Sequence, residues 1–288
     1  MPLEGLHHIT AITADAPANV DFYTRLLGLR MVKKTVNFDA PDVYHLYYGD
    51  ERGTPGSLLT FFEFPGARIG RAGDGMIHRI VWRVGSQEAL DFWVQRLEGG
   101  PIFSDPEGLE HELVVHEGDA PLTAHVEDIP DAYAIQGFHA VRAYASEPAR
   151  SDALLDALGF EPSGADGGRR LAGAEREAFY HYDPPPPELG VQGAGTVHHV
   201  AWSAADDAEL EEFRAIVSGA GAHPTPIIDR QYFHSVYFRE PSHVLFELAS
   251  RDIGFAVDEP LETLGQELKL PPQHEHLRAQ LEQILTPL

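Results

Sequence analysis

Four segments of this chain begin with a short strand-like run that contains a histidine, and this internal repeat constrains the fold more than any other feature. The histidines that mark the four copies are His8, His78, His139 and His199. Each run is followed by a polar break, a helical pattern and further strand-like runs separated by turn residues. Because self-similarity along a chain is typical of repeated structural units, the sequence predicts four copies of one β-α-β-β-β module.

A module with one small sheet and one helix buries only half a core, so the modules must pair. We expect an α+β fold with modules at residues 1–67, 74–132, 135–184 and 194–252. The remaining residues, 253–288, form a tail that ends in a predicted helix, E-H-L-R-A-Q-L-E-Q-I-L. Such a tail can cover an edge of a sheet or the mouth of a cleft.

The composition excludes several classes of partner. With 45 acidic against 21 basic residues the net charge is −24, and such a surface repels nucleic acid and anionic membranes. No apolar run reaches the roughly 18–20 residues that span a bilayer, and no signal peptide is recognisable. We therefore expect a cytoplasmic protein, and whether it forms a homo-oligomer stays open. Because the chain has no cysteine, any metal must be held by nitrogen and oxygen ligands.

The first and fourth copies each contain a histidine pair, in H-H-I-T-A-I (7–12) and H-H-V-A-W-S (198–203). Adjacent residues of a strand face opposite sides, so only one histidine of each pair can face a shared cup. The track with the bulkier apolar residues, such as Trp202, should pack under the helix. The smaller or more polar track suits a cavity, and this choice selects His8 and His199.

A carboxylate stands in the apolar run H-V-L-F-E-L-A (243–249). A buried carboxylate is costly unless it is paired or ligated, so Glu247 should have a cationic partner. Two histidines and one glutamate on strands leave open positions on a divalent metal, a set typical of non-haem Fe(II) oxygenases. A single strand histidine is more often structural, but His8 and His199 share one position in two copies. If they hold one metal, the first and fourth modules pair, and so do the second and third.

Several motifs together resemble one known superfamily over almost the whole chain. These are L-H-H-I-T, V-D-F-Y-T-R-L-L-G-L, Y-H-L-Y-Y-G-D-E-R-G-T-P-G-S, D-R-Q-Y-F-H-S-V-Y-F-R-E-P and V-L-F-E-L-A. They look like the vicinal oxygen chelate superfamily and, within it, the ring-cleaving dioxygenases that act on hydroquinones. The resemblance implies four βαβββ modules paired into two cupped half-barrels. It also implies an Fe(II) or Mn(II) centre, O₂ as co-substrate and a small aromatic substrate.

Carried over by position, the resemblance implies that His8, His199 and Glu247 are the metal ligands. It further implies roles around the metal for His7, Thr10, His198, Arg230 and Tyr237. Strand alternation points His7 and His198 away from the metal unless the strand is bulged. His243 stands where the family more often has glycine, and its role is open.

Three alternatives remain. A catechol-type extradiol dioxygenase would use His139 in place of His8, with His199 and Glu247. A glyoxalase-like isomerase would need a further carboxylate ligand from the first module. There we expect Phe61 at the position that matches Glu247, with Glu63 farther along the same face. A non-catalytic protein of the same fold would bind a small molecule without a metal.

Overall fold

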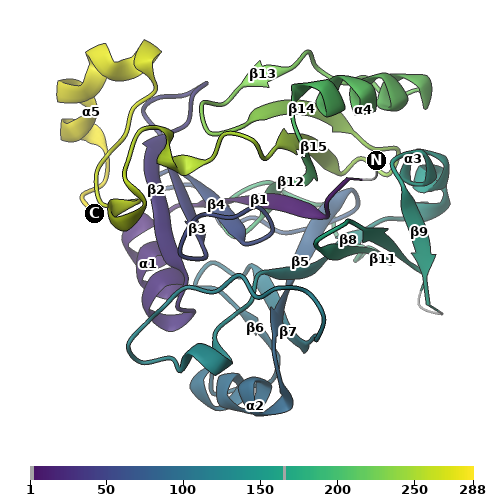
Figure 1. Cartoon of the computed structure of the whole chain (residues 1–288), viewed down its shortest axis with the longest axis horizontal. Helices are drawn as coiled ribbons and strands as arrows, with labels where there is room; N and C mark the ends of the chain where they lie inside the picture. Colours follow the sequence, from purple (N-terminus) through teal and green to yellow (C-terminus); the bar gives the residue numbers. More distant parts are fainter. Residues whose placement is uncertain (1–2, 165–166) are drawn as a thin grey trace.

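Two β-sheets form the body of the protein in the computed structural model, which describes residues 3–164 and 167–288 (Figure 1). The strands of the first sheet are β1 (Leu6–Thr13), β2 (Arg30–Val36), β3 (Tyr44–Gly49), β4 (Leu58–Glu63), β12 (Val197–Ala204), β13 (Ile228–Asp229), β14 (His234–Arg239) and β15 (Leu245–Ser250). Their order across the sheet is β13-β14-β15-β12-β1-β4-β3-β2. Strands from the beginning and from the end of the chain therefore share one sheet, and β1 pairs directly with β12.

The middle of the chain builds the second sheet. Its strands are β5 (Met76–Val84), β6 (Ile102–Ser104), β7 (Glu110–Val115), β8 (Phe138–Tyr144), β9 (Phe160–Ser163), β10 (Gly168–Ala172) and β11 (Glu177–Asp183). They lie in the order β6-β7-β5-β8-β11-β10-β9. Within both sheets the first strand of a repeat lies parallel to a later strand of the same repeat, as β1 does to β4 and β5 to β7.

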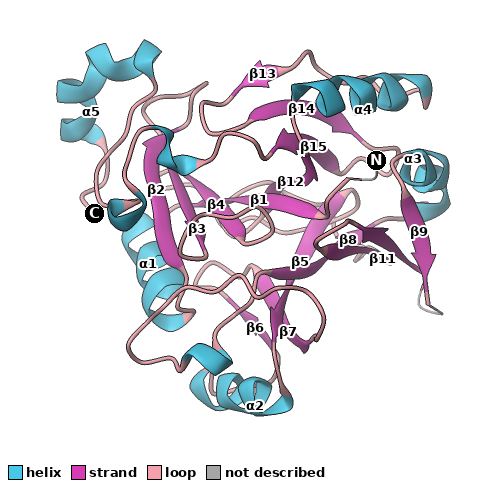
Figure 2. Cartoon of the chain, viewed as in Figure 1, coloured by secondary structure: helices cyan, strands magenta, loops and turns pink. Residues whose placement is uncertain are grey.

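Helices lie around the two sheets (Figure 2). They are α1 (Ala16–Val20), which continues as the π-helix η1 (Asp21–Leu26), α2 (Gln87–Arg96), α3 (Asp152–Ala157), α4 (Asp207–Gly219) and α5 (Arg278–Ile284). Polar side chains cap three of them: Asp15, Ser86 and Asp206 each accept a hydrogen bond from a backbone N–H in the first turn. The mixture of strands and few helices confirms the α+β fold class.

The core lies between the two sheets. Trp202 of β12 and Phe246 of β15 pack against Tyr180 of β11, with ring centroids 6.0 and 5.3 Å apart. All three side chains are fully buried. Each sheet packs one of its faces against the other sheet. The opposite face of the eight-stranded sheet can therefore line a cavity.

The C-terminal segment after β15 crosses that cavity side as a strap. It contains the 3₁₀ turns η4 (Phe255–Val257), η5 (Leu261–Thr263) and η6 (Pro272–Leu277) before α5. The Lys33 ammonium of β2 is completely buried and lies 2.7 Å from Asp258 and 2.8 Å from Glu259 of the strap. This ion-pair cluster fastens the strap to the sheet. Among the described residues, no helix has the length and apolar character needed to cross a membrane.

Candidate metal centre

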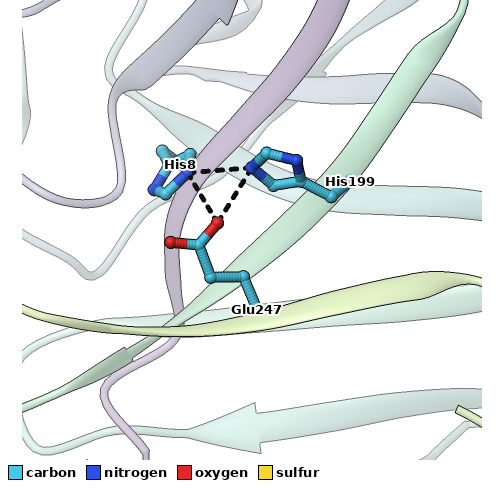
Figure 3. Close-up of side chains that lie close together, drawn as sticks. All are labelled: His8, His199 and Glu247. Atoms are coloured by element: carbon cyan, nitrogen blue, oxygen red, sulfur yellow. Dashed lines mark hydrogen bonds and ion pairs between the residues drawn. The ribbon is translucent and has the colours of Figure 1, made fainter. Parts of the chain in front are cut away.

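Three side chains with metal-ligand chemistry converge from three neighbouring strands (Figure 3). His8 lies on β1, His199 on β12 and Glu247 on β15, and all three are buried. His8 Nε2 lies 3.2 Å from His199 Nε2. The Glu247 Oε2 atom lies 3.3 Å from the His8 nitrogen and 2.9 Å from the His199 nitrogen. The three atoms therefore face one common point.

The hydrogen bonds of His7 determine which nitrogen of His8 faces that point. His7 Nε2 lies 3.0 Å from the backbone oxygen of Ser250, which can only accept, so Nε2 carries the proton. Burial lowers the pKa of His7 to about 3, which keeps the ring neutral and makes its Nδ1 an acceptor. His8 Nδ1 lies 2.9 Å from this acceptor and must donate. With the ring proton on Nδ1, the Nε2 of His8 offers the bare lone pair that a metal needs.

His198 stands beside His199 in the same way. Its Nδ1 lies 2.8 Å from His199 Nδ1, and burial lowers the pKa of His198 to about 4. Both neighbouring histidines occupy bulges of the β1–β12 pair: the register passes over His7 on β1 and over His198 on β12. Simple alternation would turn these two rings away from the site. The bulges explain how each instead reaches the ring of the next residue.

Glu247 has one oxygen tied down and one aimed at the imidazoles. Ser235 Oγ of β14 donates to Oε1 at 2.5 Å. The buried Oε2 has no hydrogen-bond partner among the described residues. Burial works to raise the pKa of Glu247, but attraction to His8 and His199 outweighs it and holds the pKa well below its ordinary value. Three acceptor atoms this close need positive charge between them, either a proton or a metal cation, and an N,N,O set suits a divalent metal.

A cavity of about 410 Å³ adjoins this group of side chains. Its wall includes His8 and His199, and most of its exposed surface is apolar. The apolar part is contributed largely by Phe38, Phe62, Phe64, Phe233, Ile228 and Leu245. A pocket with aromatic walls and a few convergent polar groups is suited to a flat, small organic molecule.

Arg230 and Tyr237 line the cavity on the β13–β14 side. Arg230 Nε donates to the Tyr237 hydroxyl at 3.3 Å, and its NH1 lies 3.0 Å from Asp39. The ring of Tyr237 is 5.7 Å from that of His199. Burial and the Glu247 carboxylate raise the pKa of Tyr237, so it stays a phenol. Because the guanidinium occupies a lone pair of the hydroxyl, the phenolic proton can be donated into the cavity.

Thr10 is on the same face of β1 as His8 but does not line the cavity. It is fully buried and bonds Thr60 Oγ1 at 2.8 Å. Sequence reasoning missed three further polar residues: Ser235, His45 and Tyr47, of which the last two line the cavity. A signal for His45 and Tyr47 was present, because alternation in V-Y-H-L-Y-Y puts both on one track.

The other marked histidines lie elsewhere. His139 is on β8 of the seven-stranded sheet, packs on Phe179 at 4.6 Å and lines a different cavity. His78 stacks on Tyr144 and pairs with Asp183 at 2.8 Å. His243 is exposed in the turn before β15, with a φ of 77°. None of the three belongs to the group of three ligands.

The expectation for Phe61 is wrong by one residue. Ala201, two residues after His199, pairs with Glu247, whereas Thr10, two residues after His8, pairs with Thr60. Thr60 is therefore the counterpart of Glu247. A slip of one residue reverses the face of a strand, so Glu63 points away, to the backbone N–H of Ala16 and to Thr286. Among the described residues of the first module, no carboxylate joins the group of three candidate ligands.

Known proteins resemble this chain over most of its length. The family model described as the glyoxalase/bleomycin resistance protein/dioxygenase superfamily matches residues 5–248. MhqO of Bacillus subtilis, which is named as a ring-cleaving dioxygenase, is 40% identical over 98% of this chain and 96% of its own. The chlorohydroquinone/hydroquinone 1,2-dioxygenase of Sphingobium indicum is 34% identical over 97% of this chain and 95% of its own.

Solved structures carry the same likeness. A crystal structure from Bacillus subtilis, described as that of a dioxygenase, superposes with a TM-score of 0.92 at 39% identity, covering 100% of this chain and 98% of that one. Glyoxalase I from Zea mays matches with a TM-score of 0.58 at 14% identity, covering 86% of this chain and 92% of that one. The second match bears on the fold alone.

Proposed function

The chain belongs to the glyoxalase/bleomycin resistance protein/dioxygenase superfamily and to its ring-cleaving dioxygenases, and we propose that it is an Fe(II)-dependent enzyme that cleaves hydroquinone-type rings with O₂. The observation that carries the proposal is the convergence of His8, His199 and Glu247 at the wall of an aromatic-lined cavity. Two histidines and one carboxylate leave adjacent positions of a divalent metal open for two further molecules. The named relatives contribute the substrate class.

The residues present fit a divalent metal. The bare Nε2 of His8 and the Oε2 of Glu247, 3.3 Å apart, are ligand atoms that a cation would satisfy. Mn(II) accepts the same ligands, and we propose Fe(II) because this ligand set is typical of Fe(II) oxygenases. When bound, the metal supplies a place where a substrate hydroxyl and O₂ are activated side by side.

The chain's own side chains prepare that place. His7 and His198 hold the ligand rings by their Nδ1 atoms, so the rings keep one orientation. Tyr237 donates its phenolic proton to an oxygen of the substrate or of O₂. Arg230 stabilises anionic charge that develops there, and it acts strongly because aromatic walls exclude water. Thr10 ties β1 to β4 through its hydrogen bond with Thr60.

Two observations count against the alternatives. An isomerase of this fold would need a carboxylate where the chain has Thr60. A catechol-type site would need His139, which lies on the other sheet. The proposed partners are a small aromatic molecule and O₂, and the cytoplasmic location stays a prediction.

The test combines metal content with turnover. Wild type, His8→Ala and His139→Ala are loaded with Fe(II) without oxygen, and bound iron is measured together with O₂ uptake on hydroquinone and catechol. We expect His8→Ala to lose iron and uptake, while His139→Ala keeps both. If His139→Ala is inactive while His8→Ala is active, the site uses His139 and the catechol-type alternative replaces our proposal. A wild type that binds no metal would leave the binding-protein alternative.

A further inference from the structure

A second polar group faces the cavity, two strands beyond the nearest ligand strand. The Tyr47 hydroxyl lies 2.9 Å from His45 Nδ1, and His45 Nε2 lies 2.9 Å from Thr60 Oγ1. Thr60 Oγ1 in turn lies 2.8 Å from Thr10 Oγ1. The four side chains form one continuous line of hydrogen bonds from β3 through β4 to β1, which we call the Tyr47 chain.

The sheet order places the Tyr47 chain opposite Tyr237 and Arg230. The ligands come from β15, β12 and β1, Tyr237 from β14 on one side, and Tyr47 from β3 on the other. Neighbouring strands lie about 4.8 Å apart, so β3 is roughly 10 Å from β1 across the sheet. Both Tyr47 and His45 line the cavity. The pocket therefore has polar groups on two sides and aromatic walls between them.

The chain can reverse its direction without creating charge. Burial raises the pKa of Tyr47 well above its ordinary value and lowers the pKa of His45 well below its ordinary value, so both side chains stay uncharged near neutral pH. In one setting Tyr47 donates to His45 Nδ1, and Nε2 donates to Thr60. In the other Thr10 donates to Thr60, Thr60 to Nε2, and Nδ1–H to Tyr47, whose own proton then points into the cavity. A neutral imidazole with two hydroxyl neighbours allows both settings.

We propose that the Tyr47 chain binds the second hydroxyl of the substrate and so selects 1,4-dihydroxybenzenes. This rests on the proposed function for the position of the first hydroxyl, at the metal ligands. An aromatic ring that fills the space between the ligands and Tyr47 presents one oxygen to each side, which is the para arrangement. Two ortho oxygens would both lie at the ligands and leave Tyr47 without a partner. Tyr47 touches the substrate, whereas His45, Thr60 and Thr10 position its hydroxyl.

The burial of the polar groups in the Tyr47 chain supports a role beyond packing. Thr10 and Thr60 are fully buried and Tyr47 is 2% exposed. Apolar β-branched residues would fill the threonine positions of a sheet equally well, and burying polar groups gains little stability. A line of buried polar groups that ends at a cavity is instead suited to hold a polar atom of a ligand, because a ligand without that atom leaves the group unpaired.

The test is equilibrium binding without oxygen to the Fe(II)-loaded protein, with hydroquinone and phenol as probes. We expect wild type to bind hydroquinone about tenfold to a hundredfold more tightly than phenol. Tyr47→Phe should bring the ratio of the two Kd values close to one and leave the Kd for phenol within about twofold of the wild-type value. Thr60→Val should reduce the ratio in the same direction, since it breaks the chain beyond His45. A merely structural role would weaken both ligands alike.

The matched control is Tyr48→Phe. Tyr48 is the next residue of β3, is equally buried and donates to Asn19 Oδ1 at 2.9 Å on the core side. Its loss should leave the ratio unchanged. A Tyr47→Phe protein that keeps the preference for hydroquinone, or a wild type without one, overturns the inference. O₂ uptake is measured separately. If the protein prefers hydroquinone over phenol but consumes no O₂, only the dioxygenase proposal fails. If it consumes O₂ but binds both ligands equally tightly, only this inference fails.

Discussion

Replacement of Ser235 by alanine should weaken metal binding without unfolding the site. Ser235 Oγ donates to Glu247 Oε1 at 2.5 Å, and both residues are fully buried. The bond holds the carboxylate so that Oε2 faces the two imidazoles. Removing a partner of a metal ligand costs about 10- to 100-fold in metal affinity. In free energy this is roughly 1.4–2.7 kcal/mol, which agrees with about 1.5–3 kcal/mol for a hydrogen bond to a charged group.

The assay is competition for Fe(II) between the protein and a chelator of known affinity under nitrogen. Ser203→Ala is the control: Ser203 is equally buried on β12, but its hydroxyl has no hydrogen-bond partner among the described residues. We expect the control to bind iron as wild type does. If Ser235→Ala also binds iron within about twofold of wild type, the carboxylate needs no such support and the reasoning on Glu247 fails.

Three further outcomes are expected. Burial lowers the pKa of His111 to about 3, so between about pH 6.5 and pH 3 the unfolded chain binds a proton that the folded chain does not. The free energy of unfolding of the metal-free protein should therefore fall as the pH drops through this range, by up to about 1.4 kcal/mol per pH unit from this group. Urea titrations should show that this free energy depends less steeply on pH in His111→Gln than in wild type. Lys33→Met leaves the buried Glu259 without its cation and should lower the free energy of unfolding in urea by about 3–5 kcal/mol. Lys269→Met removes the cation of an exposed ion pair and should lower it by under about 1 kcal/mol. Equal effects would contradict the inference that the buried ion pairs of Lys33 hold the strap on the sheet. Arg230→Gln should lower kcat about 10²-fold or more in O₂ uptake with iron retained, and unchanged turnover would remove Arg230 from the reaction.

The features that follow from local pattern were predictable. The repeat and the α+β class depend on residues close together in sequence, so periodicity and polarity suffice. The positions of His8, His199 and Glu247 could be proposed because each stands on the less bulky track of its strand or within an apolar run. Their metal-binding role stays a prediction, as do the module boundaries.

The features that depend on register were not predictable. The bulges at His7 and His198 exist only because β1 meets β12, and nothing within either strand reveals the offset. The same limit explains the error at Phe61, since one residue of slip exchanged Thr60 for its neighbour. Ser235 was missed because a lone serine in a strand carries no signal until the strand beside it is known.

The nested strand order also sets when this protein can begin to work. The seven-stranded sheet comes from one continuous stretch, β5 to β11, and can assemble while the ribosome is still adding residues. β1 emerges first but must wait for β12, because His8 and His199 are 191 residues apart. Until synthesis reaches β12, the N-terminal strands present an unpaired edge at β1 that neighbouring nascent chains can capture. If His8, His199 and Glu247 hold a metal as proposed, loading must follow the synthesis of β15, and a chain truncated before Glu247 would lack one of the three ligands.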